Sequence, residues 1–372
     1  MKIVADKDIP FVEKYFAGLG ELVLKSGRLI KHADVSTADI LLVRSITKVN
    51  KELLSNTTVK WVGSVTTGHD HLDVAWLEQQ GIGWSVAAGF NAVPVVEYVI
   101  CVVAALQQRM GILTGADLTA GVIGVGAIGQ QVADKLKILG FNVLLCDPLR
   151  AENESNFCSV NIEELVNLDF ITMHTPLTRD GPYPTYHLIE KDFLQRQKSH
   201  VVLLNTGRGS VINSVALKKY GQHLRWCFDV WEHEPQIDKA ILMDAVLATP
   251  HIAGYSVQAR YRGVDMIYQA ACQAGVIAEK QRTLITWPEQ ELAFSDATLT
   301  WQEVILAIYD PSLTSYAMKN LLLSSEHSGD MFDQMRKGFM DRYEFSSTRV
   351  GGVSLRERDK AILTALGCLL AC

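Results

Sequence analysis

The chain has 372 residues, of which 48% are hydrophobic and 20% charged, enough to fold two or three domains around cores of their own. Its formal net charge of −6 provides no basic excess of the kind that nucleic-acid-binding surfaces need. The apolar segment 93–106 contains Glu97 and is shorter than the roughly 20 residues of a membrane helix, so no membrane partner is expected.

Two further features favour a cytoplasmic protein. The N-terminus reaches Asp6 too early for a signal peptide. The seven cysteines contain no CxxC pair, which is typical of reduced, buried thiols rather than of a disulfide framework or a zinc site.

The first ninety residues alternate short apolar runs with helical segments. Helices are expected over 10–19 and 71–80, the second ended by Gly81. Strands are expected at 2–5, 40–44, 59–65 and 82–86. Strands separated by helices predict a parallel sheet with crossover connections.

A long apolar helix over 91–109 precedes a second α/β series. Its strands are expected at 119–123, 142–146, 170–174, 201–205 and 226–230, and the pattern continues to about residue 251. A helix over 266–279 can return the chain to the first domain. In the tail we expect a strand over 298–309, a helix over 329–343 and a final apolar stretch over 361–372.

A glycine-rich segment follows the first strand of the second series. Gly124, Gly126 and Gly129 form the pattern G-x-G-x-x-G, and a helical segment can follow it. The first glycine permits a tight turn, the second lets a pyrophosphate approach the backbone, and the third allows close helix–strand packing. Free N–H groups at the helix start, around Ala127 and Ile128, attract phosphate. The segment therefore predicts a dinucleotide-binding site.

An acidic residue ends the next predicted strand. Asp147 lies 18 residues beyond the last glycine, where a carboxylate accepts hydrogen bonds from the ribose hydroxyls of NAD. The same carboxylate repels the 2′-phosphate of NADP. Arg150 is a complication, because a nearby arginine can hold that phosphate. We expect NAD rather than NADP.

Three later segments each follow a predicted strand, where open α/β sheets bind ligands, and contain Arg208, Glu234 and His251 in that order. Oxidation of a 2-hydroxy acid needs a base for the hydroxyl proton, which suits histidine. It needs a cation for the carboxylate, which suits arginine, and an anion beside the base, which suits glutamate. Each residue alone is commonly a loop or surface residue, so the prediction depends on all three following a dinucleotide fingerprint.

The order of these motifs resembles the D-isomer-specific 2-hydroxyacid dehydrogenase family over roughly residues 40–285. Beside the glycine fingerprint, the motifs are Thr206-Gly207-Arg208-Gly209, Asp229-Val230 with Glu234-Pro235, and Thr249-Pro250-His251-Ile252-Ala253-Gly254. The resemblance implies that Arg208, Glu234 and His251 are catalytic. It also implies that Asp229 contacts the nicotinamide side of NAD.

Residues 43–50, the stretch 174–188 and residues 251–255 are similar to one branch of this family. That branch oxidises 4-phospho-D-erythronate to 2-oxo-3-hydroxy-4-phosphobutanoate with NAD, in the synthesis of pyridoxal 5′-phosphate (vitamin B6). The similarity implies substrate contacts from Ser45, Thr66 and Tyr255. Beyond the glycine segment, it implies NAD contacts from Asp147, Thr175, Thr206, Gly207, Arg208, Asp229 and Gly254.

The phosphate of such a substrate needs a basic recess with hydroxyl donors. Arg44, Ser45, Arg260 and Arg262 are candidates that the sequence does not rank. No metal is expected, because hydride transfer to NAD needs none.

The expected fold class is α/β. It combines a Rossmann-type doubly wound NAD domain over 93–256 with a flavodoxin-like substrate domain over 1–92 and 257–285. A small α+β C-terminal domain over 286–372 is expected to hold a homodimer. Two alternatives stay open: a dehydrogenase for another 2-hydroxy acid such as phosphoglycerate, and an NAD-sensing binding protein on the same fold.

Overall fold

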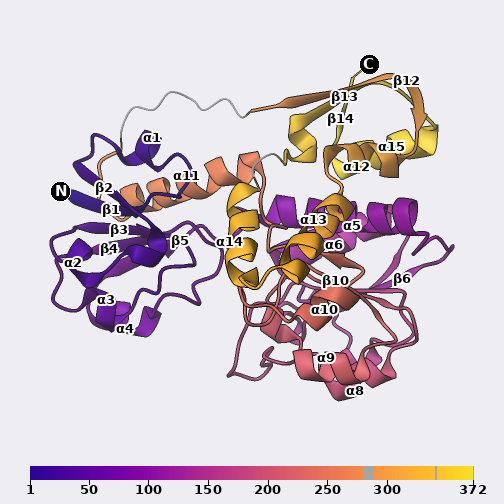
Figure 1. The fold of residues 1–372 in the computed structure, drawn as a ribbon, viewed down its shortest axis with the longest axis horizontal. Coiled ribbons are helices and arrows are strands. Elements are labelled where there is room, and N and C mark those ends of the chain that lie inside the picture. Colours follow the sequence, from indigo (N-terminus) through magenta and orange to yellow (C-terminus); the bar gives the residue numbers. More distant parts are fainter. Residues whose placement is uncertain (280–287, 340–341, 372) are drawn as a thin grey trace. The chain divides into compact units, whose positions relative to one another are not determined.

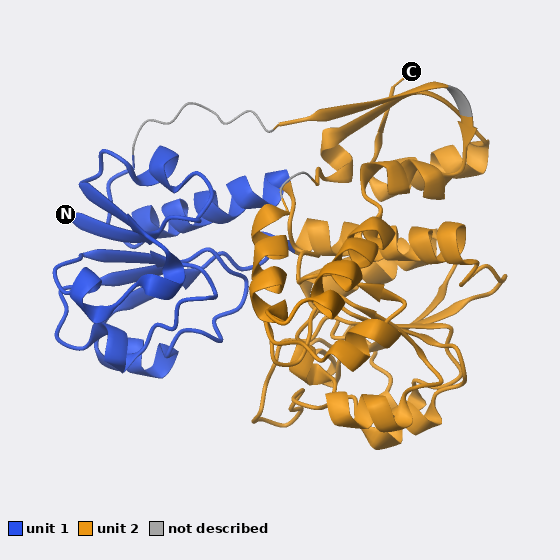
Figure 2. Cartoon of the chain, viewed as in Figure 1, with its two compact units in different colours: residues 1–91, 257–287 blue, residues 92–256, 288–372 orange. Residues whose placement is uncertain are grey.

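The computed structural model describes residues 1–279, 288–339 and 342–371. The chain divides into two compact units (Figure 2). Unit 1 contains residues 1–91 and 257–287, and unit 2 contains residues 92–256 and 288–372. The C-terminal residues thus belong to the same unit as the glycine-rich segment.

Unit 1 is built on a five-stranded parallel sheet in the order β2-β1-β3-β4-β5, the flavodoxin-like order (Figure 1). Its strands are β1 (Lys2–Asp6), β2 (Glu21–Lys25), β3 (Ile40–Val43), β4 (Trp61–Ser64) and β5 (Gly83–Val86). Its helices are α1 (Val12–Phe16), α2 (His32–Val35), α3 (Lys51–Leu54), α4 (Val74–Gln79) and α11 (Val257–Gln273). All residues of β3 and β4 are buried, which explains why β3 is an apolar run and why β4 begins with two large apolar residues, Trp61 and Val62.

Four strands of unit 1 confirm the sequence predictions, whereas β2 was not predicted. β2 is an edge strand whose apolar run, Leu22–Leu24, is only three residues long and partly buried, so its hydrophobic signal is weak. The helix expected over 266–279 is α11, which begins at Val257 and ends at Gln273. The predicted start of this helix was too late. Polar residues at 258, 260 and 262 interrupt the apolar pattern of the first turns, although these turns have a buried face.

Unit 2 contains a six-stranded parallel sheet in the order β11-β10-β9-β8-β6-β7. Its strands are β6 (Thr119–Ile123), β7 (Asn142–Cys146), β8 (Phe170–Met173), β9 (Val202–Asn205), β10 (Arg225–Phe228) and β11 (Leu247–Ala248). The helices between them are α6 (Ala127–Ile138), α7 (Pro148–Asn153), α8 (Lys191–Arg196), α9 (Ser214–Tyr220) and α10 (Lys239–Asp244). The chain leaves β6 on one side to β7 and crosses back to β8, so the strand order reverses at β6. Ligands bind at such a switch point in doubly wound sheets.

The predicted helix over 91–109 is α5 (Ala92–Met110). It is the one helix in the described part of the chain that is long and apolar enough to cross a membrane. However, 72% of its most apolar window is buried inside the structure. It packs against α6 and α12, so its composition is that of a core helix.

The C-terminal part of unit 2 adds a three-stranded parallel sheet in the order β12-β13-β14. Its elements are β12 (Gln290–Leu299), α12 (Trp301–Ile308), α13 (Pro311–Ser324), α14 (Ser328–Gly338), β13 (Thr348–Leu355), α15 (Glu357–Leu366) and β14 (Leu369–Leu370). α13 packs against β11 and α14, and Figure 1 shows α13 beside α14. Because β11 is an edge strand, this segment is attached to the edge of the larger sheet.

The strand predicted over 298–309 is wrong. Thr300 caps a helix there: its hydroxyl accepts from the Glu303 N–H, and the Glu303 side chain accepts from the Thr300 N–H. This capping box begins α12, and the strand lies before it. The helix predicted over 329–343 is confirmed as α14, although residues 340–341 lie outside the described chain. The stretch 361–372 is divided between α15 and β14, with residue 372 not described.

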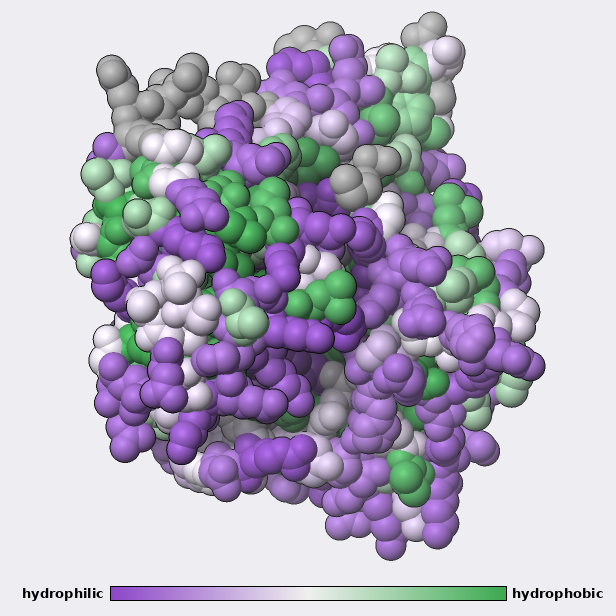
Figure 3. Space-filling view, turned by 60° about the vertical axis from the view of Figure 1, so that its left-hand side comes forward, coloured by the Kyte–Doolittle hydropathy of each residue, from purple (hydrophilic) through white to green (hydrophobic). Residues whose placement is uncertain are grey.

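Hydrophilic residues predominate on the face shown in Figure 3, and apolar residues form separate patches there. A mostly polar surface over apolar sheets is the arrangement that the composition predicts.

Candidate active site

The glycine-rich loop joins β6 to α6. Gly124 has a φ of +82°, a left-handed conformation that side chains strain. A Cβ at Gly129 would lie 1.9 Å from the Gly124 carbonyl oxygen, so only glycine fits where helix and strand meet. At Gly126 a Cβ would meet nothing within 4 Å. The N-terminus of the 12-residue helix α6 is therefore open to a phosphate ligand.

Asp147 lies directly after β7 and contacts this loop. Its Oδ2 accepts from the Val125 N–H at 2.8 Å, and its Oδ1 accepts from the Arg150 N–H at 3.0 Å. The Arg150 guanidinium donates to the Val125 carbonyl and to the side chains of Gln130 and Glu154. Arg150 therefore braces the loop with its donors, which weakens the argument that it serves a 2′-phosphate.

Thr175 provides a test of whether the loop fits a dinucleotide. Its hydroxyl is buried and has no hydrogen-bond partner among the described residues. A Cβ at Gly124 would lie 2.7 Å from the Thr175 side chain, and one at Gly207 would lie 2.9 Å from its carbonyl oxygen. An orphaned hydroxyl between two glycine loops fits a polar ligand. The residues present thus fit NAD.

His174 lies beside this cradle with both ring nitrogens engaged. Thr172 and Thr206 place hydroxyl oxygens 3.0 Å from Nε2 and Nδ1, respectively. Burial lowers the pKa of His174 to about 3, so the ring is neutral near physiological pH. It links the ends of β8 and β9, and we assign it no proton transfer.

Glu234 and His251 form a pair. Their Oε2 and Nδ1 atoms are 2.7 Å apart, and Glu234 Oε1 accepts from the Trp231 N–H at 2.8 Å. Burial raises the pKa of Glu234, but the charge and hydrogen bond of His251 and the charge of Arg336 lower it further, so the net shift is downward. Both side chains remain partly exposed, at 20% for Glu234 and 32% for His251. The carboxylate holds Nδ1 and leaves Nε2 as the nitrogen that can exchange a proton.

Asp229 builds the loop that carries His251. Its carboxylate accepts from the Thr249 hydroxyl and from the N–H groups of Ile252 and Ala253, at 2.7–2.9 Å. Burial raises its pKa, against the opposing effect of the His251 charge. Only 1% of Asp229 is exposed, so any contact to nicotinamide involves a carboxylate that already orders the loop.

Arg208 follows β9 at the same edge of the sheet. Its backbone is fixed by Asn205, whose amide donates to the Arg208 carbonyl at 3.0 Å and whose carbonyl accepts from the Gly207 N–H. The next residue must be glycine, because a Cβ at Gly209 would lie 2.0 Å from the backbone of Trp231. The half-buried guanidinium donates to the Gly207 carbonyl. Of the other predicted residues, Thr206 and Gly207 lie in the loop that carries Arg208, and Gly254 lies in the loop that carries His251.

The predicted substrate contacts fall in both units. In unit 1, Ser45 is exposed, and the Thr66 hydroxyl donates to the Gly68 carbonyl at 2.8 Å. Arg44 forms ion pairs with Asp6 and Asp8 at 2.7 and 3.0 Å. Among the other basic candidates, Arg262 donates to the Phe90 carbonyl within unit 1. Tyr255 belongs to unit 2 and lies half-buried at the end of the His251 loop.

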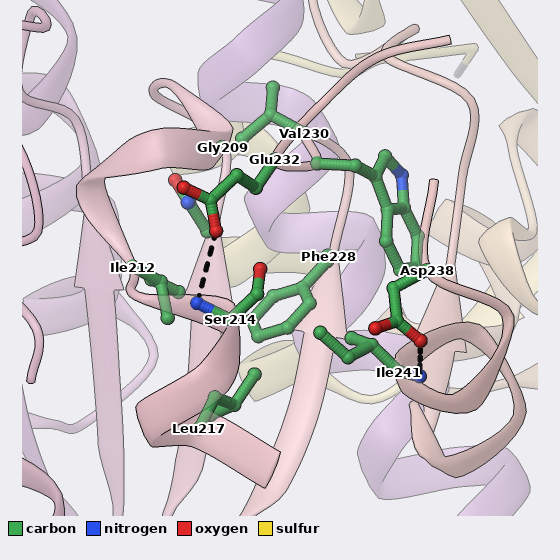
Figure 4. Close-up of a pocket in the computed structure, with 11 residues that line it drawn as sticks. Gly209, Ile212, Ser214, Leu217, Phe228, Val230, Glu232, Asp238 and Ile241 are labelled. Carbon is green, nitrogen blue, oxygen red and sulfur yellow. Dashed lines mark hydrogen bonds between the residues drawn. The ribbon is translucent and has the colours of Figure 1, made fainter. Parts of the chain in front are cut away.

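A second histidine–glutamate pair was not predicted. His187 Nε2 lies 2.7 Å from Glu232 Oε1, and the other carboxylate oxygen accepts from the Ser214 N–H. Beside Glu232 is a cavity of about 20 Å³, enough for one water molecule, lined by Gly209, Phe228 and Trp231 among others (Figure 4). Arg208, Glu234 and His251 do not line this cavity, so it is an internal void of unit 2 rather than a substrate pocket.

Comparisons with known proteins agree with this geometry. A family model for the D-isomer specific 2-hydroxyacid dehydrogenase, NAD binding domain, matches residues 104–253. An erythronate-4-phosphate dehydrogenase of Coxiella burnetii is 41% identical over 356 residues, covering 94% of this chain and 95% of the relative. The enzyme of that name from Marinobacter nauticus is 39% identical over 362 residues and covers 94% of each chain.

Solved structures share the fold. NAD-dependent formate dehydrogenase from Staphylococcus aureus, in complex with NAD, has a TM-score of 0.59 at 24% identity and covers 74% of this chain and 96% of its own. D-Lactate dehydrogenase from Aquifex aeolicus, complexed with NAD and lactic acid, has the same TM-score at 23% identity and the same coverage. The fold, the Glu234–His251 pair and the near full-length identity have one explanation: the chain belongs to the erythronate-4-phosphate dehydrogenase family, within the D-isomer-specific 2-hydroxyacid dehydrogenases.

Proposed function

We propose that the protein oxidises 4-phospho-D-erythronate at C2 to 2-oxo-3-hydroxy-4-phosphobutanoate with NAD, in the synthesis of pyridoxal 5′-phosphate. The observation that carries the proposal is the 2.7 Å pair of Glu234 and His251, behind an NAD-binding fingerprint, in a chain 41% identical to an erythronate-4-phosphate dehydrogenase. The Glu234–His251 pair identifies the general base, and the similarity to erythronate-4-phosphate dehydrogenases identifies the substrate.

His251 acts as the general base. Glu234 holds the proton on Nδ1, so the Nε2 lone pair accepts the proton of the C2 hydroxyl. The imidazolium that forms is stabilised by the Glu234 carboxylate. In the reverse reaction the same Nε2–H returns the proton to the carbonyl oxygen.

Arg208 holds the substrate. Its guanidinium is planar and always charged, so it binds the C1 carboxylate and the C2 oxygen as that oxygen becomes a carbonyl. The hydrogen bonds of the Asn205 side chain to the backbone of Gly207 and Arg208 fix the position of the Arg208 Cα atom. This positioning favours loss of hydride from C2 over oxidation at the other hydroxyl-bearing carbons.

NAD, when bound, accepts the hydride that leaves C2. The chain binds its pyrophosphate at Gly124, Gly126, Ala127, Ile128 and Gly129, and its adenosine ribose at Asp147. The nicotinamide half is assigned to residues of the later loops: Thr175, Thr206, Gly207, Arg208, Asp229 and Gly254. The orphaned Thr175 hydroxyl supports this placement.

Ser45, Thr66 and Tyr255 are proposed to contact the substrate beyond C2. Rates with NAD for 4-phospho-D-erythronate and for 3-phosphoglycerate test the substrate. We expect the former to have the higher kcat/KM. A higher kcat/KM for 3-phosphoglycerate would make the chain a dehydrogenase for a different acid on the same fold.

A homodimer formed through the C-terminal segment is part of the proposal. α13 exposes two large apolar residues one turn apart, Leu313 at 70% and Tyr316 at 72%. Replacing both by Lys should convert a dimer into a monomer in sedimentation at micromolar concentration. Val215→Lys on α9, which is 71% exposed, is the matched control and should leave the dimer intact.

We place the protein in the cytoplasm. All cysteines among the described residues are unpaired, and burial raises the pKa of the Cys146 and Cys227 thiols to about 12. Buried, protonated thiols are typical of proteins kept in a reducing compartment. Cell fractionation tests the assignment, and recovery in a membrane or secreted fraction would contradict it.

A further inference from the structure

The C-terminal segment contacts the loop that carries the catalytic histidine. Arg342, only 2% exposed, donates to the Ala253 carbonyl at 3.1 Å. Glu344 accepts from the Ser256 hydroxyl at 2.8 Å. A Cβ at Gly329, in the first turn of α14, would lie 2.9 Å from the side chain of Gln236, two residues after Glu234. The segment thus packs against the loops that carry His251 and Glu234 within unit 2, in addition to any role in dimerisation.

Arg336 projects from α14 towards this site. Its Nη2 lies 3.5 Å from the Tyr255 hydroxyl, and its guanidinium carbon lies 5.9 Å from the centre of the Phe332 ring. Its Nε is buried and has no hydrogen-bond partner among the described residues. No carboxylate of the described chain forms an ion pair with it. A buried N–H of a cationic group that has no acceptor is costly, which is why such groups are rare outside functional sites.

The surroundings keep Arg336 charged. Burial lowers its pKa, but the Tyr255 hydroxyl and the negative charges of Glu234 and Asp229 raise it further, so the net shift is upward. The cation therefore faces the reaction centre without being neutralised by a direct partner. A substrate anion is the natural complement of such a group.

Other cations are less suited to the phosphoryl group of the substrate. Arg208 is needed for the C1 carboxylate, and Arg44 is shared between Asp6 and Asp8.

We propose that Arg336, together with the Tyr255 hydroxyl, binds the phosphoryl group of the substrate and so determines specificity for a phosphorylated acid. This inference rests on the proposed function for the identity of the substrate. It assigns the C-terminal segment a direct part in substrate recognition.

Steady-state kinetics of Arg336→Gln test the inference. We expect KM for 4-phospho-D-erythronate to rise roughly 10- to 100-fold, the effect of losing a charge-assisted hydrogen bond, while kcat changes little. Inorganic phosphate, used as a competitive inhibitor, should lose affinity by a similar factor. Turnover of unphosphorylated D-erythronate and the Kd for NAD should be unchanged. Arg336→Lys should recover part of the loss, because it keeps the charge without the planar fork.

Lys337→Gln is the control, because it removes one positive charge from an exposed position of the same helix. Equal losses with the phosphorylated and unphosphorylated acids, or a displaced pH profile at unchanged KM, would show that Arg336 acts through Glu234 and would overturn the proposal. Unchanged kinetics would overturn it as well. If the wild-type protein oxidises a different phosphorylated acid, the substrate assignment fails, and the same variants measured with that acid still decide the role of Arg336.

Discussion

Replacing Glu234 by Gln should remove the base without removing the fold. The two carboxylate oxygens of Glu234 accept from two donors, the Trp231 N–H at 2.8 Å and the His251 Nδ1–H at 2.7 Å. Glutamine has one acceptor oxygen and one donor group. If its oxygen accepts from Trp231, its NH₂ donates to Nδ1, which moves the imidazole proton to Nε2 and leaves no base there.

The expected loss can be worked from this contact. A carboxylate at hydrogen-bond distance stabilises the imidazolium that forms in the reaction, and a charge-assisted hydrogen bond of this kind contributes about 1.5–3 kcal/mol. Losing this stabilisation together with the active tautomer should lower kcat/KM for oxidation by about 10²–10⁴-fold. Binding of NAD should be unaffected, because Glu234 is not among the residues assigned to it.

The assay is NADH formation from 4-phospho-D-erythronate across a pH series, with Glu232→Gln as the matched control. Glu232 lies two residues away and also contacts a histidine, at 2.7 Å from His187, but does not contact His251. The control should keep near wild-type kcat/KM. Loss of less than about threefold in Glu234→Gln, or equal loss in both variants, would refute the reasoning.

Four further variants test the cofactor cradle and the histidine beside it. Asp147→Ala should weaken NAD binding and narrow the kcat/KM gap between NAD and NADP; an unchanged ratio would exclude the assigned role. Gly129→Ala should lower stability by roughly 1–3 kcal/mol in chemical denaturation, because its Cβ would meet the Gly124 carbonyl at 1.9 Å. A Cβ at Gly126 would meet no atom within 4 Å, so Gly126→Ala should keep the wild-type Tm but bind NAD less well, because the added methyl group lies where the pyrophosphate approaches. Equal losses of stability in the two glycine variants would contradict this distinction. His174 has a folded pKa depressed from 6.5 to about 3, so the unfolded chain binds its proton first, and stability should fall as pH decreases through that range. His174→Gln should weaken this pH dependence, and an identical pH dependence in the variant would contradict the account.

Sequence patterns predicted the parallel sheets because their strands are buried on both faces. β3 and β4 in unit 1 and β8 and β9 in unit 2 are entirely buried, so each is mostly apolar: β3 is apolar throughout, and the other three contain one polar residue each, Ser64, Thr172 and Asn205. The pair of Glu234 and His251 could be predicted for a related reason. Both residues follow neighbouring strands of one parallel sheet, whose carboxyl ends meet at the same edge.

Other features depend on contacts that the local sequence does not encode. β2 lies at a sheet edge and is only half-buried, so its pairing with β1 leaves little hydrophobic signal. Arg336 is an isolated arginine on a partly exposed helix. Its proposed role follows from its contact with Tyr255, which lies 81 residues earlier in the chain. For α12 the signal was present: the Thr300 and Glu303 capping box marks a helix start, although the β-branched residues around it favoured a strand.

The choice of Glu234 over Glu232 as the partner of His251 depended on the resemblance of Glu234-Pro235 to the family motif. Both glutamates lie in one short segment after β10, and each bonds a histidine at 2.7 Å. Spacing alone does not separate them. The structure does, because the turn at Trp231 and His233 directs the two carboxylates to different loops.

Transfer of deuterium from C2 tests the central claim most directly. With 4-phospho-D-[2-²H]erythronate and NAD, the account predicts one deuterium at C4 of the nicotinamide ring for each 2-oxo acid formed, detected by mass spectrometry and NMR. It also predicts that His251→Asn binds NAD and forms neither product at a comparable rate. NADH without deuterium, deuterium retained in the acid product, or undiminished turnover by His251→Asn would contradict C2 oxidation with His251 as the base.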